Sequence, residues 1–146
     1  MGTEESVILL VEDNESHALL ARRGLSQYKK PVKIIHVING EAAIDYLFRR
    51  GSYSDPIISP RPRLILLDLR LPRIDGLDVL KEVKEDEDLK SIPVVILTSS
   101  MAEPDIIRSY YFNANSYLVK PLDFNDFRQE MIDLANYWLK WNINPL

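Results

Sequence analysis

The chain has 146 residues, of which 46% are hydrophobic and 27% charged, enough for one globular domain with a full apolar core. The net charge of -4 gives no general reason to expect nucleic-acid binding, and no apolar run is long enough to cross a membrane. Because the chain has no cysteine, disulfides, thiol catalysis and cysteine metal sites are excluded, and we expect a cytoplasmic protein.

Strands and helices are predicted to alternate along the chain. The first half contains a predicted strand at 7–11, a helix at 16–28, a strand at 32–38 and a helix at 40–50. The second half contains predicted strands at 64–67, 94–97 and 117–119, a helix around 77–83 and a final helix after the capping residue Asp123. Three strands are continuous apolar runs, which indicates a parallel sheet covered on both faces. The alternation favours a doubly wound α/β fold in a single domain.

The longest irregular segment is predicted at 51–63, where three prolines interrupt the pattern between the second helix and the third strand. We interpret it as a surface loop and not as a linker between domains. The arginines around it could form a local basic patch, but we interpret them as solvated loop residues. They are Arg49, Arg50, Arg61 and Arg63.

The final helix has apolar residues three or four positions apart, a spacing that also occurs in seams between chains. We expect the first four to contact the sheet, namely Phe124, Phe127, Met131 and Leu134. Trp138 and Trp141 lie where the core should end, and exposed tryptophans commonly mark an interface. We therefore predict that these two residues contact a second copy in a homodimer.

Polar residues stand where the apolar strands end. They are Glu12 and Asp13 after the first strand, Asp68 after the third, Thr98 at the end of the fourth and Lys120 after the fifth. The carboxyl ends of parallel strands form one ligand-binding edge, so these side chains are predicted to converge. Singly they have simpler interpretations, because Asp13 or Thr98 could cap a helix and Lys120 could form a structural salt bridge.

Asp68 is the hardest of these residues to explain by structure alone, because an acid that ends an apolar strand is strongly desolvated unless it is paired. Clustered carboxylates repel one another and resist ionisation, and a divalent cation relieves this repulsion. Hard oxygen ligands favour Mg²⁺. A carboxylate beside a metal, an ammonium and a hydroxyl suits phosphoryl transfer, in which the carboxylate attacks phosphorus and becomes an acyl phosphate.

Four segments together resemble the receiver domain of two-component response regulators. They are Leu10–Asn14, Leu66–Gly76, Val94–Ser100 and Tyr117–Pro121, each at the end of a predicted strand. The resemblance implies a flavodoxin-like, CheY-like fold with a five-stranded parallel sheet and five helices. We assign residues 1–146 to a single receiver domain, with a core at about 7–139 and a C-terminal helix extension and tail at about 137–146.

The resemblance also implies a role for each strand-end acid. Asp68 would be the phosphoacceptor, and its phosphoryl group would come from a sensor histidine kinase. Glu12 and Asp13 would hold Mg²⁺ directly or through water, together with Asp68. The main-chain carbonyl of Arg70 would be a further metal ligand.

The remaining roles concern the response to phosphorylation. Thr98 would contact the phosphoryl group, and Lys120 would pair with that group or with the phosphoacceptor. Tyr117 resembles the aromatic switch of the family, whose ring turns inward when the threonine moves, although it could be only a half-buried strand tyrosine. The Lys120–Pro121 bond is expected to be cis, which would aim the lysine into the site.

Two other classes of function are weighed against a signalling module. A haloacid-dehalogenase-like phosphatase usually has a second acid two residues after its nucleophile, where this chain has Arg70. A receiver-like binding module without phosphorylation would usually lack one of the acids or the lysine. We therefore do not expect an enzyme.

Many members of the family have a neutral side chain in place of Arg70. The guanidinium of Arg70 could assist phosphodonor binding or obstruct attacking water.

The proline-containing loop and Tyr137–Trp141 resemble those of small stand-alone regulators that partner phytochrome-type histidine kinases. Because Ile143–Leu146 ends the chain, we expect no DNA-binding output domain. The protein could bind a downstream target directly, or it could pass its phosphoryl group to a histidine phosphotransfer protein. The sequence leaves both outputs open.

Overall fold

The continuously apolar runs form the centre of one parallel sheet in a computed structural model that describes residues 5–145. The strands are β1 (Ser6–Val11), β2 (Val32–Val37), β3 (Leu64–Leu67), β4 (Val94–Thr98) and β5 (Ser116–Val119). The helices are α1 (Glu15–Leu25), α2 (Gly40–Leu47), α3 (Gly76–Glu85), α4 (Glu103–Tyr111) and α5 (Phe124–Asn136), with a 3₁₀ turn at Gly51–Tyr53 and a π-helical turn at Tyr137–Trp141. The predicted five parallel strands and five helices are confirmed.

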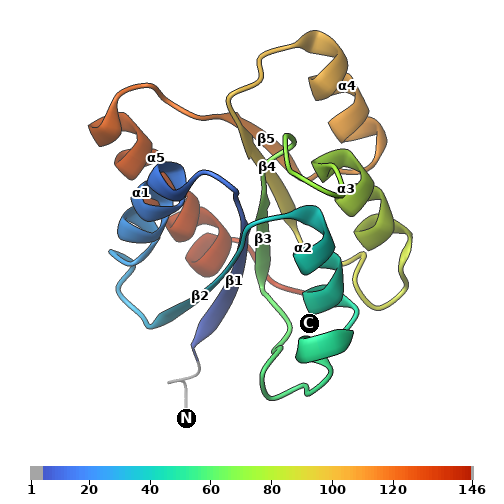
Figure 1. The fold of residues 1–146 in the computed structure, drawn as a ribbon. Coiled ribbons are helices and arrows are strands. Elements are labelled where there is room, and N and C mark those ends of the chain that lie inside the picture. Colours follow the sequence, from blue (N-terminus) through green and yellow to red (C-terminus); the bar gives the residue numbers. More distant parts are fainter. Residues whose placement is uncertain (1–4, 146) are drawn as a thin grey trace.

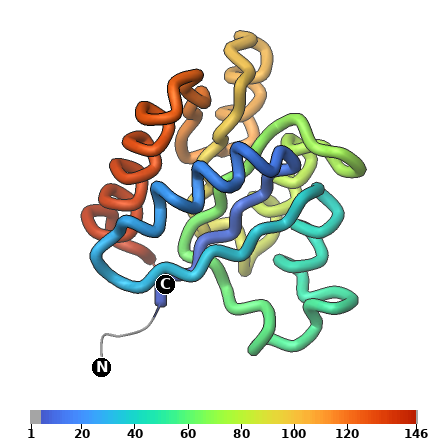
Figure 2. Tube along the Cα trace, turned by 60° about the vertical axis from the view of Figure 1, so that its left-hand side comes forward, coloured from blue at the N-terminus to red at the C-terminus, as the bar shows by residue number. Residues whose placement is uncertain are grey.

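Helices cover both faces of the sheet (Figure 1). α1 and α5 lie side by side on one face, and α2, α3 and α4 lie on the other (Figures 1 and 2). Successive residues of the central strands point to opposite layers, so that Leu9 and Ile65 pack toward α2 and α3, whereas Ile8 and Leu64 pack toward α1 and α5. These strands are buried on both sides, which explains why their sequences are continuously apolar.

The strand order β2-β1-β3-β4-β5 determines where a ligand can bind. All neighbouring strands are parallel, so their carboxyl ends share one edge, near the top of the sheet in Figure 1. The chain leaves β1 toward one face of the sheet and leaves β3 toward the other. In folds of this kind, the ends of two neighbouring strands whose connections leave toward opposite faces are the usual binding place.

Side-chain caps begin three of the helices. The side chain of Asn14 accepts a hydrogen bond from His17 N at 3.0 Å, and that of Asn39 accepts one from Ala42 N at 2.7 Å. Asp123 caps α5 as predicted, since its carboxylate accepts from Asp126 N at 3.0 Å. The acid next to Asn14 is therefore not needed as a cap.

The proline-containing loop at 51–63 is held against the end of α2. The buried Tyr46 hydroxyl donates to the carbonyl of Pro60 at 2.6 Å, and the Arg49 guanidinium donates to the carbonyl of Ser59 at 3.3 Å. Arg61 donates to the carbonyl of Leu47. Arg49, Arg61 and Arg63 are half-buried, so their interpretation as solvated residues was wrong. A loop carbonyl holds Arg49, and a carbonyl at the end of α2 holds Arg61. Arg50 is exposed, as expected.

α5 packs on the sheet through Phe127, Met131 and Leu134, which are buried as predicted. Phe124 was predicted to join them, but it is 71% exposed. It occupies the first turn of the helix, close to the exposed Leu122, and belongs to neither buried cluster. The spacing of apolar residues alone does not show at which turn the buried face of α5 begins.

The end of the chain leaves apolar surface uncovered. Trp138 is half-buried and packs against the cluster between the sheet, α1 and α5, whereas Trp141 is 67% exposed. No helix within residues 5–145 is long and apolar enough to cross a membrane. Residues 1–4 and 146, which the predicted domain includes, lie outside the described part of the chain.

Replacing Tyr46 by phenylalanine should lower the free energy of unfolding by about 1–2 kcal/mol, because the Pro60 carbonyl loses its donor. Burial raises the pKa of Tyr46 to about 12, so the hydroxyl keeps its proton throughout the neutral range. Urea unfolding followed by circular dichroism measures the change. Tyr110→Phe, which alters a half-exposed side chain, is the control and should change the value by less than about 0.5 kcal/mol. Equal midpoints for both variants would contradict the assignment.

Candidate functional site

The acids predicted to converge do meet at the carboxyl edge of the sheet. Glu12 and Asp13 follow β1, Asp68 follows β3, and these two strands are neighbours. One carboxylate oxygen from each of the three residues lies within 4.8 Å of the others. Glu12 and Asp68 are buried, whereas Asp13 faces solvent. The cluster is therefore open on one side and enclosed by the sheet on the other.

Main-chain hydrogen bonds fix the positions of the two buried acids. Asp68 N donates to the carbonyl of Val11 at 3.1 Å, which continues the pairing of β3 with β1 by one residue. The Glu12 carbonyl accepts from His36 Nε2 at 2.7 Å. A Cβ at Gly76 would collide with the main chain of Asp68, so only glycine lets α3 begin so close to this acid. The backbone under the cluster is thus tightly constrained.

Lys120 supplies the positive charge of the site. Its ammonium lies 2.5 Å from Glu12 Oε1 and 2.8 Å from Asp68 Oδ2. The third contact, at 3.0 Å, is to His17 Nδ1 in the first turn of α1. An ammonium has three N–H donors, and all three have an acceptor here. His17 was not recognised from the sequence; its place just after the acids of the first strand was the available signal.

The Lys120–Pro121 peptide bond, which was predicted to be cis, is not: no peptide bond in the described part of the chain is cis. The trans isomer is favoured even before proline, by about 0.5–1 kcal/mol. The lysine side chain reaches both acids from this trans backbone. A cis bond is therefore not required to direct it into the site.

Burial and charge set the electrostatics of the cluster. Burial raises the pKa of Glu12 to about 7, although the hydrogen bond and the charge of Lys120 act in the opposite direction. Burial, followed by the Lys120 charge, lowers the pKa of His17, which favours the neutral imidazole that accepts from the ammonium. The cluster contains one ammonium and three carboxylates, so the positive charge of Lys120 does not balance it. Their hard oxygen atoms suit a divalent cation, so the residues present fit the predicted metal site.

Thr98 and Tyr117 lie beside the cluster on β4 and β5. Thr98 is buried, and its carbonyl accepts from Lys120 N at 2.8 Å, which makes the threonine and the lysine direct neighbours. The half-buried Tyr117 donates its hydroxyl proton to the carbonyl of Ser100 at 2.9 Å. Thr98 does not cap α4, whose N-cap residue is Ala102. The alternative structural interpretation of Thr98 is therefore excluded.

Arg70 stands in the loop after Asp68, as its sequence position requires. Its main-chain N–H donates to Asp68 Oδ1 at 3.4 Å, but its side chain turns toward α4. There Nη2 lies 2.5 Å from Asp105 Oδ2. Asp105 is buried and was not singled out in the sequence, because its partner lies 35 residues away and nothing local signals the pair.

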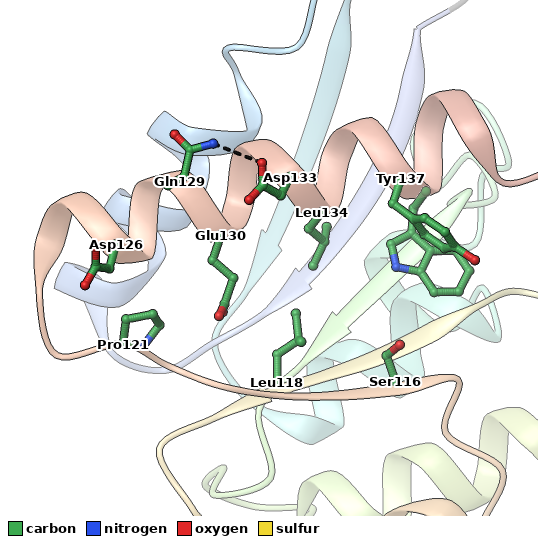
Figure 3. A pocket seen from close by; sticks show the side chains of 10 residues that line it. Ser116, Leu118, Pro121, Asp126, Gln129, Glu130, Asp133, Leu134 and Tyr137 are labelled. Carbon is green, nitrogen blue, oxygen red and sulfur yellow. Dashed lines mark hydrogen bonds between the residues drawn. The ribbon is translucent and has the colours of Figure 1, made fainter.

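A separate hollow lies between β5 and α5 (Figure 3). Ser116 and Leu118 form its strand side, on the face of β5 opposite Tyr117. The Glu130 carboxylate points into the hollow, and its Oε1 is buried without a hydrogen-bond partner. Burial raises the pKa of Glu130. This hollow shares no residue with the acid cluster.

Comparison with known proteins agrees with this geometry. Residues 8–132 match the family model of the response regulator receiver domain. The response regulator Rcp1 of Synechocystis is 42% identical over 92% of this chain and 89% of that protein. The probable methanogenesis regulatory protein FilR2 of Methanothrix harundinacea is also 42% identical, over 95% of this chain and 87% of its own length. Most of the chain thus matches most of each relative.

Solved structures extend the match to the whole fold. The crystal structure of the phosphorylated cyanobacterial phytochrome response regulator RcpA has a TM-score of 0.93 and 37% identity, and it covers 98% of this chain and 100% of its own. The Mn²⁺-bound form of response regulator Rcp1 has a TM-score of 0.90 and 40% identity, with 97% and 99% coverage. The chain belongs to the receiver-domain family of two-component response regulators.

Proposed function

We propose that Asp68 accepts a phosphoryl group from a sensor histidine kinase and that the modified protein then changes its binding to other proteins. The observation on which this rests is the buried Asp68 carboxylate, set between two further acids and the Lys120 ammonium in a receiver-family chain. An oxygen of this carboxylate attacks phosphorus, and a new O–P bond forms while the P–N bond to the kinase histidine breaks. The bonding electron pair returns to the imidazole nitrogen.

The other side chains of the cluster support this transfer electrostatically. Lys120, which is already 2.8 Å from Asp68, neutralises charge on the phosphoryl oxygens, and the Thr98 hydroxyl donates a hydrogen bond to one of them. Glu12, Asp13, Asp68 and the main-chain carbonyl of Arg70 would hold a Mg²⁺ ion. When bound, that ion would neutralise negative charge on the transferring group.

Tyr117 is proposed to report the phosphorylation to the surface. In the structure its hydroxyl is held by the Ser100 carbonyl, in the loop that follows Thr98. A shift of Thr98 toward the phosphoryl group would move this loop and release the hydroxyl, so that the ring could turn inward. The exposed side of β5 would then change shape.

The relatives support a phytochrome-type histidine kinase as the phosphodonor, because RcpA is described as a phytochrome response regulator. Downstream, we propose either a directly bound target protein or a histidine phosphotransfer protein. The chain would thus act as a signalling module and not as an enzyme with a diffusible substrate. We place this activity in the cytoplasm, with which the cysteine-free composition is compatible.

We also propose that the protein forms a homodimer through its last helical turns. Trp141 is 67% exposed, and Tyr137 and Ile143 beside it are exposed too. Large apolar side chains gathered at one place favour contact with another surface. Trp138 would take part mainly by supporting this region, since it is half-buried against its own core.

Asp68→Asn should abolish phosphorylation by acetyl phosphate in the presence of Mg²⁺, because the amide lacks the nucleophilic oxygen. Intact-protein mass spectrometry should show one added phosphoryl group on the parent and none on the variant. Asp78→Asn, which neutralises an exposed carboxylate on α3, serves as the matched control and should be labelled like the parent. Equal labelling of Asp68→Asn would exclude this residue as the phosphoacceptor.

Substitutions around the cluster should shift divalent-cation affinity in opposite directions. Asp13→Asn should weaken Mn²⁺ binding at least about tenfold, because a charged ligand is lost. Lys120→Met should strengthen it, since the competing ammonium 2.5 Å from Glu12 is removed. Electron paramagnetic resonance of free Mn²⁺ measures both constants, with Asp78→Asn again as the control. Parent-like affinity in Asp13→Asn would rule out this metal site.

Trp141→Ala should shift the protein toward the monomer without loss of stability, because the side chain is mostly exposed. Sedimentation equilibrium should give a weaker dimer constant for the variant, while its urea midpoint stays that of the parent. Tyr111→Ala, which removes a 78% exposed ring from α4, is the control for the loss of any surface aromatic. A monomeric parent would disprove the dimer.

A further inference from the structure

The Arg70 guanidinium is held at the rim of the acid cluster by a residue outside it. Arg70 follows Asp68 by two positions, and its main-chain N–H faces Asp68 Oδ1 at 3.4 Å. Its side chain is 62% exposed, yet its tip lies 2.5 Å from the carboxylate of Asp105, whose side chain is only 6% exposed. The ion pair thus joins an exposed arginine side chain to a buried aspartate side chain.

Asp105 also organises the loop between β4 and α4. The same carboxylate oxygen that contacts Arg70 accepts from Ser100 Oγ at 2.5 Å, and Ser100 Oγ accepts from Ala102 N at 3.2 Å. The carbonyl of Ser100 holds the Tyr117 hydroxyl at 2.9 Å. A continuous chain of polar contacts therefore leads from the loop after Asp68 to the aromatic side chain on β5.

A phosphoryl group on Asp68 would compete with Asp105 for this guanidinium. It brings up to two negative charges and three acceptor oxygens, whereas Asp105 offers one charge. The planar guanidinium pairs with phosphate oxygens in a bidentate manner, and little burial restrains the Arg70 side chain. Its main chain is already in contact with the Asp68 carboxylate, so the movement needed is a rotation of the side chain.

We propose that Asp105 is a positioning residue which retains Arg70 before phosphorylation, and that Arg70 then exchanges Asp105 for the phosphoryl group on Asp68. This inference rests on the proposed phosphorylation of Asp68. After the exchange, the buried Asp105 carboxylate keeps the Ser100 hydroxyl as its hydrogen-bond donor. The ion pair between Arg70 and Asp105 is then lost, and Asp105 is the residue that holds Ser100. Because the carbonyl of Ser100 holds the Tyr117 hydroxyl, this loss links the arginine to the aromatic side chain.

Beryllofluoride, which places a tetrahedral anionic group on an aspartate oxygen, tests the exchange without phosphodonor chemistry. Its affinity in the presence of Mg²⁺ would be measured by calorimetry. Arg70→Ala should bind it about tenfold more weakly, through loss of a charge-assisted hydrogen bond. Asp105→Asn should bind it up to about fivefold more tightly, because the competing ion pair is gone. The double variant should match Arg70→Ala.

The chain offers a matched control in the same loop. Arg73 forms an ion pair with Glu41 at 3.3 Å, and both side chains are largely exposed. Arg73→Ala therefore removes one arginine charge close to the site without touching the Asp105 contact, and it should leave the affinity unchanged. A purely structural role for Asp105 predicts weaker or unchanged binding in Asp105→Asn, which would overturn the proposal, as would parent-like binding in Arg70→Ala.

A measurement on the parent protein keeps the test independent of how the variants fold. The Nε–H resonance of Arg70, assigned by its absence in Arg70→Ala, should shift when beryllofluoride is added. A resonance that stays in place would show that the guanidinium remains on Asp105 and would refute the exchange. Beryllofluoride binding that is absent from the parent, or that survives Asp68→Asn, would instead overturn the proposed function, and this inference with it.

Discussion

The structure depends on one electrostatic imbalance, in which a single ammonium is enclosed with more carboxylates than it can neutralise. Lys120 uses all of its donors on Glu12, Asp68 and His17, while Asp13 remains at the open side. Burial makes this arrangement costly, as the raised pKa of Glu12 indicates. The sheet holds these charges in place, and their negative excess favours an additional cation.

The fold concentrates these groups by topology and not by sequence proximity. The order β2-β1-β3-β4-β5 makes β1 and β3 neighbours, so acids from positions 12 and 68 meet although they are far apart in the sequence. The main chain below them is fixed by strand pairing and by the close approach of Gly76. The Arg70 side chain, in contrast, is 62% exposed. The site therefore combines a constrained floor with an exposed rim.

Much of this could be predicted from the sequence, because an acid that ends a continuous apolar run occupies a known place in a parallel sheet. Asp68 was located in this way, and Lys120 from its place after the less regular predicted strand at 117–119. Contacts that depend on side-chain direction could not be predicted, such as the pairing of Arg70 with Asp105 across 35 residues. The exposure of Phe124 was missed for a related reason, since helical periodicity gives a direction around the axis but not the edge of the layer that covers it.

The proline-containing loop at 51–63 lies at the amino end of β3, the opposite end of the strand from Asp68. Its base is fastened to α2 by Tyr46 and Arg61, whereas Ile57 at its tip is 84% exposed. The fixed base of the loop and its exposed tip are thus only a few residues apart. A fluorophore or a surface tether attached at residue 57 would leave the acid cluster and the Arg70 side chain undisturbed. Residue 57 is therefore a suitable labelling position for single-molecule experiments.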